Sequence, residues 1–255
     1  MKASGFMIDL DGTIYKGNVP IPGAKEFISQ LKTKGIPFVF LTNNSSHSRE
    51  HYLKKLNGMG FDVSMNNILT STVATIRYIK KNFPGESVYP LGTEQFVSEV
   101  KVSGITISDK PDIVLLAFDR TITYEKINNA YNFLKGGSKF IATHPDDLCP
   151  TESGYDIDIG PFIRMFEQMT GTAATVIGKP NVAMVDMAAS EMNVNRNGIC
   201  MIGDRISTDM KMASDAGIKS ILVLSGEASR NDVKIMKSPP TEVLDSVANI
   251  VAEPL

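Results

Sequence analysis

An apolar run that ends in a pair of acids decides the fold of this chain: Gly5-Phe6-Met7-Ile8-Asp9-Leu10-Asp11-Gly12-Thr13. Its first half has the length and composition of a buried β-strand. Because ligands bind beyond the carboxyl ends of strands in an open parallel sheet, we expect Asp9 and Asp11 to project into a crevice. Two carboxylates on one face of extended chain repel each other unless a cation lies between them. An isolated Asp-Gly pair is typical of a turn, but the whole string after a strand is much more specific.

Strand-like and helix-like segments alternate on both sides of this run. Helices are predicted over 24–34, 49–59, 182–192 and 208–216, and strands over 5–9, 37–41, 199–202 and 220–224. The strands are almost continuously apolar, whereas the helices carry their apolar residues on one face. This pattern predicts an α/β protein with a doubly wound parallel sheet, covered by helices on both faces.

The middle of the chain alternates in the same way, after a polar break at 80–85. Strands are predicted over 88–91, 113–117 and 139–142, and helices over 124–134 and 162–169. We interpret 80–177 as a second α/β domain, inserted into a core domain made of 1–79 and 178–255.

Three more polar strings stand at predicted strand ends or helix starts. Thr42 and Asn43 follow the second strand, where a polar loop or a helix cap is the more ordinary explanation of the string taken alone. Lys179 precedes the helix at 182–192, at a helix start whose N–H groups favour an anion. Asp204 and Asp209 follow the strand at 199–202. Each string is ordinary by itself, but acids, a hydroxyl and a lysine at neighbouring strand ends together predict a site for a metal ion and a phosphate.

Composition and charge exclude several classes of protein. The chain has 255 residues, with 26 Lys and Arg against 28 Asp and Glu, so its formal charge is −2. This balance argues against binding to nucleic acid or to anionic membranes. Its two cysteines, Cys149 and Cys200, are too few for a disulfide framework or a thiolate metal site. No secretory signal or membrane-spanning run is recognisable, so we expect a cytoplasmic protein.

The four strings resemble, in order and spacing, the four motifs of the haloacid dehalogenase-like (HAD) hydrolases. They are Asp9-Leu10-Asp11-Gly12-Thr13, Leu41-Thr42-Asn43-Asn44, Gly178-Lys179-Pro180 and Gly203-Asp204 through Asp209. The Thr-Asn-Asn and Gly-Lys-Pro forms, with a large insertion between them, resemble the p-nitrophenyl phosphatase-like and NagD-like subclass. The resemblance implies a HAD-like Rossmannoid core and an inserted α/β cap domain that closes over it.

The resemblance also implies a hydrolase of phosphoric monoester bonds that requires Mg²⁺. Asp9 would be the nucleophile that forms an aspartyl-phosphate, and Asp11 the general acid and base. Mg²⁺ would be held by the Asp9 carboxylate, the Asp11 backbone carbonyl and Asp204. The resembling dehalogenases lack the second acid, because a halide leaves without a proton, so Asp11 favours phosphoester chemistry.

The remaining site residues follow from the same resemblance. Thr42 and the Asn43 backbone would bind phosphoryl oxygens, and Lys179 would neutralise their charge. Asp209 would have a secondary role in orientation or in contact with metal-bound water.

Two residues of the insertion are candidates for substrate contact. His144 lies in a loop that faces the active site in the resembling subclass, and Asp119 follows another predicted strand, 113–117. The expected substrate is a small phosphorylated metabolite, such as a sugar phosphate or an organic-acid phosphate. A homodimer is possible, since members of the subclass often pair through their caps.

Two alternatives stay open at this stage. The motifs alone do not say whether water or a hydroxyl group accepts the phosphoryl group, so a mutase is possible. A phosphorylation-switched binding module, similar to a response-regulator receiver, also uses an acid pair, a threonine and a lysine. Its phosphoacceptor normally lies on a later strand than the acid pair, and it needs no cap.

Overall fold

The computed structural model describes residues 1–151 and 154–255, which form two compact units. The first unit consists of Met1–Thr42, Glu50–Leu69 and Lys179–Leu255, and the second of Asn43–Arg49 and Thr70–Gly178. The second unit thus contains the whole segment 80–177, together with 43–49, 70–79 and 178. A functional boundary between core and cap at 80 and 177 stays a prediction.

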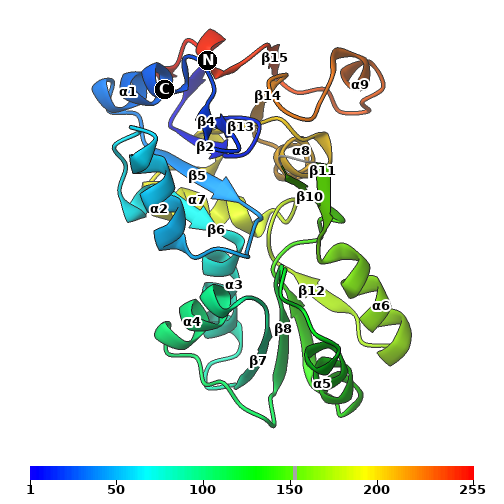
Figure 1. Cartoon of the computed structure of the whole chain (residues 1–255). Helices are drawn as coiled ribbons and strands as arrows, with labels where there is room; N and C mark the ends of the chain where they lie inside the picture. Colours follow the sequence, from blue (N-terminus) through cyan, green and yellow to red (C-terminus); the bar gives the residue numbers. More distant parts are fainter. Residues whose placement is uncertain (152–153) are drawn as a thin grey trace. The chain divides into compact units, whose positions relative to one another are not determined.

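The first unit is built on a six-stranded sheet with the order β15-β14-β13-β2-β5-β6 (Figure 1). These strands are β15 (Glu242–Leu244), β14 (Lys219–Val223), β13 (Ile199–Gly203), β2 (Gly5–Asp9), β5 (Phe38–Thr42) and β6 (Ile68–Thr70). The five strands from β15 to β5 run parallel to one another. The first predicted strand, β2, therefore lies inside the sheet, and all five of its residues are buried.

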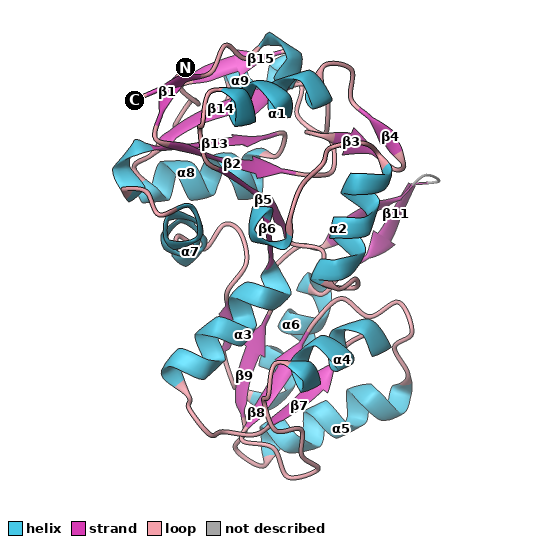
Figure 2. Cartoon of the chain, turned by 90° about the vertical axis from the view of Figure 1, so that its left-hand side faces the viewer, coloured by secondary structure: helices cyan, strands magenta, loops and turns pink. Residues whose placement is uncertain are grey.

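Helices cover both faces of this sheet. Phe6 and Ile8 of β2 pack in one core with buried residues of α1 (Ala24–Thr33) and α2 (Arg49–Gly58). On the opposite face, α7 (Ala183–Met192) packs against β2 and β5, and α8 (Lys211–Ala216) against β14 (Figure 2). The α/β class and the doubly wound parallel sheet are confirmed.

The second unit has its own parallel sheet, with the order β12-β9-β8-β7. Its strands are β7 (Val88–Leu91), β8 (Ile113–Leu116), β9 (Lys139–Ala142) and β12 (Ala174–Val176), and its helices α3 (Ser71–Asn82), α4 (Glu94–Val102), α5 (Tyr124–Lys135) and α6 (Gly160–Thr170). Apolar residues of α5 and α6 form a core with one face of the sheet. The hydroxyls of Thr70, Thr93 and Thr123 cap the N-termini of α3, α4 and α5.

The structure contains two helices and several short elements that the sequence prediction lacked. The helix predicted over 208–216 begins as a π-helical turn, η3 (Ile206–Met210), before α8. Sequence periodicity also missed the helices α3 and α4, and the polar break expected at 80–85 overlaps the last turn of α3. It further missed several strands of two to four residues, which are too short to show a repeat. The remaining elements are β1 (Lys2–Ala3), β3 (Tyr15–Lys16), β4 (Val19–Pro20), β10 (Leu148–Thr151), β11 (Gly154–Ile157), β16 (Glu253–Pro254), α9 (Arg230–Lys234), η1 (Met65–Asn67), η2 (Arg196–Gly198) and η4 (Val247–Asn249). Among the described residues, none of the helices has the length and apolar character needed to span a membrane.

Candidate active site

Neighbouring strand ends bring the predicted core residues to one edge of the first unit's sheet. Asp9 is the last residue of β2, Thr42 is the last residue of β5, and Asp204 directly follows β13. Because β2 lies between β13 and β5 and all three are parallel, their carboxyl ends meet at the same edge. The ladder register confirms this, since Asp9 is paired with Leu41, one residue before Thr42.

A buried lysine joins two of the acids. Lys179 stands ahead of α7, and its Nζ donates a hydrogen bond to Asp9 Oδ1 and another, of 2.7 Å, to Asp209 Oδ1. Burial by itself would lower the pKa of Lys179, but the charges of Asp209 and Asp9 outweigh it and hold that pKa above its ordinary value. A charged lysine therefore stands beside the proposed nucleophile.

Asp9, Asp204 and Asp209 form a compact cluster, which we call the three-acid cluster. Carboxylate oxygens of the three residues lie within 4.8 Å of one another, and all three residues are buried. Burial raises the pKa of each to about 6, and repulsion among the acids adds to this effect. A set of donors made only of oxygens fits a hard divalent cation such as Mg²⁺, which would relieve the repulsion.

Two hydrogen bonds and a glycine hold Asp204 in this cluster. Glu227 N donates to Asp204 Oδ2 at 2.7 Å, and Thr13 Oγ1 donates to Asp204 Oδ1 at 3.3 Å. Gly12 has a φ of +83°, and a Cβ atom there would lie 2.4 Å from Asp204 Oδ2. The Asp11-Gly12 pair of the first motif therefore forms a turn, as an isolated Asp-Gly pair typically does. Its glycine also leaves the space that the Asp204 carboxylate occupies.

Asp11 stands outside the three-acid cluster. The side chain of Asp11 is solvent-accessible. The surrounding protein nevertheless removes part of the water around its carboxylate, and this desolvation raises the pKa of Asp11, although the positive charge of Lys55 acts in the opposite direction. Tyr15 Oη donates to Asp11 Oδ2 at 3.3 Å, and Lys55 Nζ lies 4.0 Å from the centroid of the Tyr15 ring. Sequence analysis missed Tyr15 and Lys55, because the first lies in a short hairpin and the second on a polar helix face.

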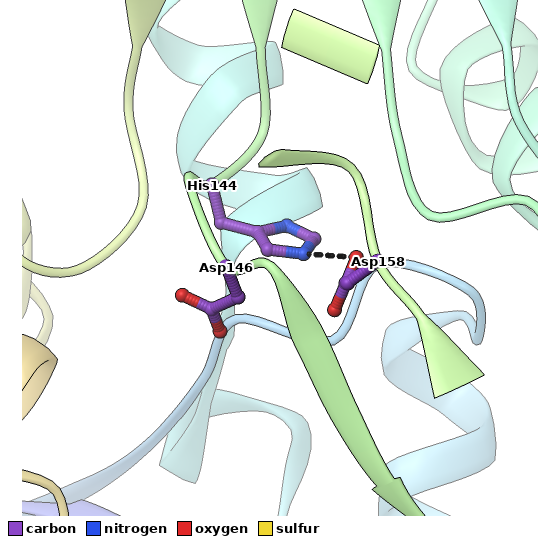
Figure 3. Close-up of side chains that lie close together, drawn as sticks. All are labelled: His144, Asp146 and Asp158. Carbon is purple, nitrogen blue, oxygen red and sulfur yellow. Dashed lines mark hydrogen bonds and ion pairs between the residues drawn. The ribbon is translucent and has the colours of Figure 1, made fainter. Parts of the chain in front are cut away.

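The other predicted residues, Asn43, Asp119 and His144, belong to the second unit. Asp119 is buried, and its Oδ2 accepts a hydrogen bond of 2.6 Å from Lys126 Nζ. His144 is fully buried, and its Nε2 lies 2.9 Å from Asp158 Oδ1 (Figure 3).

Asn43 Nδ2 donates to both carboxylate oxygens of Asp146, at 3.1 and 3.3 Å. Sequence analysis identified neither Asp146 nor Asp158. A signal for Asp146 was present, since it follows His144 and Pro145 in the same strand-end loop.

Comparisons with known proteins agree with this geometry. A family model described as haloacid dehalogenase-like hydrolase matches residues 6–106, and a HAD-hydrolase-like model matches residues 176–250. The sugar-phosphatase AraL of Bacillus subtilis is 34% identical, over 97% of this chain and 92% of that protein.

Two solved structures are similar over almost their whole length. The 4-nitrophenylphosphatase of Thermotoga maritima is 38% identical with a TM-score of 0.93, over 96% of this chain and 95% of that one. NagD of E. coli is 30% identical with a TM-score of 0.90, over 98% of this chain and 99% of that one. With the four motifs assembled as described, the chain belongs to the haloacid dehalogenase-like hydrolases and, among them, to the NagD-like phosphatases.

Proposed function

We propose that this protein is a Mg²⁺-dependent phosphatase that hydrolyses small phosphomonoesters, sugar phosphates foremost among them. The observation that carries the proposal is the Lys179–Asp9 ion pair within the three-acid cluster, with Asp11 accessible beside it. Charge-neutralising groups around a carboxylate nucleophile suit attack on an anionic phosphoryl group. The relative AraL, which is called a sugar-phosphatase, supports the choice of substrate class.

In the first half-reaction, an Asp9 oxygen attacks phosphorus while the bond from phosphorus to the leaving oxygen breaks. Asp11 gives its proton to that oxygen, so the product leaves as an alcohol and Asp9 carries the phosphoryl group. The raised pKa of Asp11 suits this role, because a protonated carboxyl must be available before the step.

In the second half-reaction, Asp11 takes a proton from water, and the water oxygen forms a bond to the phosphorus of phosphorylated Asp9. The bond from phosphorus to the Asp9 oxygen breaks, and inorganic phosphate leaves. Thr42, the Asn43 backbone and Lys179 hold the phosphoryl oxygens in both steps. Asp209 orients Lys179 through their 2.7 Å hydrogen bond.

The Asp9 carboxylate, the Asp11 backbone carbonyl and Asp204 would hold Mg²⁺. When bound there, the ion would supply positive charge to the phosphoryl oxygens and to Asp9, which otherwise repel each other. Burial and the fixed hydrogen bonds of Asp204 support this assignment.

Recognition of the leaving group is assigned to 80–177, with His144 and Asp119 as the candidate residues. Both His144 ring nitrogens have hydrogen-bond partners, so a direct contact with substrate requires an exchange of one of these bonds. A homodimer and a cytoplasmic location stay predictions from the sequence.

A panel of phosphorylated metabolites, assayed with and without Mg²⁺, tests the proposed function. We expect turnover of sugar phosphates that chelation abolishes, with release of inorganic phosphate equal to that of the alcohol. Transfer of the phosphoryl group to a second metabolite, without phosphate release, would favour the mutase. Stable phosphorylation of the protein without turnover would favour the binding module.

A further inference from the structure

Asn43, the residue after Thr42, is held from within the second unit at its side chain and its carbonyl group. Its Nδ2 donates to Asp146 Oδ1 at 3.1 Å and to Oδ2 at 3.3 Å. Its backbone carbonyl accepts a hydrogen bond of 2.7 Å from Ser71 Oγ. A Cβ atom at Gly178 would lie 2.7 Å from Asn43 Oδ1, so the chain ahead of Lys179 also packs closely against this amide. These contacts restrict both the side chain and the backbone of Asn43.

Asp146 is itself held by the structure around it. Gly160 N, at the start of α6, donates to the Asp146 carbonyl at 2.8 Å, and Asp158 N donates to the Asp147 carbonyl at 2.9 Å. Asp158 Oδ1 lies 2.9 Å from His144 Nε2 (Figure 3). The same oxygen accepts a hydrogen bond of 2.7 Å from Ile159 N. Hydrogen bonds thus hold the loop that carries Asp146 both before Pro145, at His144, and after it, at Asp146 and Asp147.

A chain of hydrogen bonds links the same loop to the segment after Asn43. Phe118 N donates to Ser45 Oγ at 2.9 Å, and Ser45 Oγ lies 3.0 Å from Thr143 Oγ1. Thr143 Oγ1 lies 2.9 Å from His144 Nδ1. When Nε2–H donates to the Asp158 carboxylate, Nδ1 accepts from Thr143, and Thr143 accepts from Ser45. The hydroxyls of Ser45 and Thr143 then each accept one hydrogen bond and donate one, so a neutral His144 imidazole fits this chain of hydrogen bonds.

We propose that Asp146 is a positioning residue for the phosphate-binding segment, acting through the side chain of Asn43, and that the His144–Asp158 pair acts through Asp146. The inference rests on the proposed function, in which the Asn43 backbone N–H binds a phosphoryl oxygen. A carboxylate acceptor makes a stronger hydrogen bond with the amide than a neutral one does. With the Asn43 side chain held in this way, its backbone N–H keeps one direction.

The first test compares Asp146→Ala with Asp147→Ala, using inorganic phosphate as the probe. Asp147 is an exposed neighbour in the same loop, and its carboxylate pairs with Arg164 at 2.7 Å. We expect Asp146→Ala to raise the inhibition constant for phosphate and the KM for substrate together, by about five- to tenfold for the loss of one hydrogen-bonded group. Asp146→Asn keeps an acceptor oxygen and should recover most of the affinity, and Asp147→Ala should change neither constant.

The inhibition constant for phosphate distinguishes a positioning role of Asp146 from a mere loss of folded protein in the variant. A smaller fraction of active enzyme lowers kcat but leaves the inhibition constant for phosphate unchanged. Equal phosphate affinity in Asp146→Ala, Asp147→Ala and the wild type would overturn the inference.

The second test is a double-mutant cycle with Asn43→Ala, which removes the amide and leaves the backbone N–H. If Asp146 acts through Asn43, Asp146→Ala changes phosphate affinity little once the amide is gone. Full additivity of the two effects would overturn the inference.

The third test decides how His144 acts. A positioning role predicts that His144→Ala weakens phosphate binding and raises the KM of all substrates by a similar factor. Asp158→Asn, which keeps an acceptor for Nε2, should be milder. A changed ranking of substrates with unchanged phosphate affinity would overturn the positioning role and indicate direct contact with the leaving group.

The inference and the proposed function fail in different ways. Wild-type protein that binds phosphate but turns over no phosphoester would contradict the function, and the Asp146 comparison on phosphate affinity would still decide the positioning role. Normal turnover with additive effects in the cycle would contradict the positioning role alone.

Discussion

Lys179 joins Asp9 to Asp209, although Asp9 lies 170 residues before it and Asp209 lies 30 residues after it. The lysine side chain is only 4% exposed, so its charge is balanced by these two carboxylates rather than by water. The buried Lys179 ammonium group therefore has two effects. It balances the charge of the acids at the sheet edge, and it lies beside Asp9, the proposed nucleophile, which must approach an anionic substrate.

Asp9→Asn should abolish turnover and leave the fold intact. The two side chains have nearly the same shape, but the amide cannot attack phosphorus to form an acyl phosphate. Steady-state assays with circular dichroism as the folding control make the comparison. Activity above a trace in a correctly folded variant would contradict covalent catalysis by Asp9.

Asp11→Asn should separate the two half-reactions. An ester with a very good leaving group needs little proton donation, so phosphorylation of Asp9 should continue while hydrolysis of the phosphorylated enzyme slows. Mass spectrometry of the quenched variant should then detect a phosphoryl adduct. If no activated ester gives such an adduct, the role assigned to Asp11 lacks support.

Lys179→Met should destabilise the metal-free protein at pH 7.5. Removing one partner leaves buried carboxylates without a counter-charge, which costs about 3–5 kcal/mol of unfolding free energy. Urea denaturation measures the loss. The matched control is Lys211→Met, because the exposed Lys211–Asp215 pair, at 2.8 Å, should contribute no more than about 0.5 kcal/mol. Equal stability of the two variants would show that Lys179 is not needed to balance the three-acid cluster.

The stability of the metal-free protein should depend on pH through the same cluster. Asp9, Asp204 and Asp209 have pKa values of about 6, above the ordinary 3.8. Folding therefore favours their protonated forms, and their contribution is fully present below about pH 4 and is lost as the pH rises through 6. The melting temperature in the presence of a chelator should fall between pH 5 and 7.5.

Mg²⁺ should raise that melting temperature more at pH 7.5 than at pH 5, because the ion binds ionised carboxylates. In Asp204→Asn, both the fall with pH and the gain with Mg²⁺ should shrink. Asp215→Asn, at an exposed position of α8, is the control. A Mg²⁺ effect of the same size at both pH values would argue against binding at this cluster.

Local sequence was sufficient to predict the first motif and the four inner strands of the first unit's sheet, β2, β5, β13 and β14. The apolar run Gly5-Phe6-Met7-Ile8 specifies a buried strand at β2, and the acids Asp9 and Asp11 that end this run must lie at the carboxyl end of the strand. The alternation of strands with amphipathic helices then predicted the parallel sheet, because parallel neighbours need a crossover helix between them. The position of Asp9, Thr42 and Asp204 at one edge of the sheet was predicted in this way, since each stands where a recognisable strand ends.

Only the tertiary structure decided which side chains meet. Position 12 must be a glycine because the carboxylate of Asp204, which is remote in sequence, occupies the space of a Cβ atom there. Asp146 accepts a hydrogen bond from Asn43, although 103 residues separate the two. His144 was predicted from its place in a loop, but its burial and its bond with Asp158 depend on how α6 and the neighbouring loops pack. Periodicity and turn chemistry report on a residue and its near neighbours along the chain. A hydrogen bond between distant segments depends on the packing of the whole unit, which brings donor and acceptor together and excludes the water that would otherwise satisfy both.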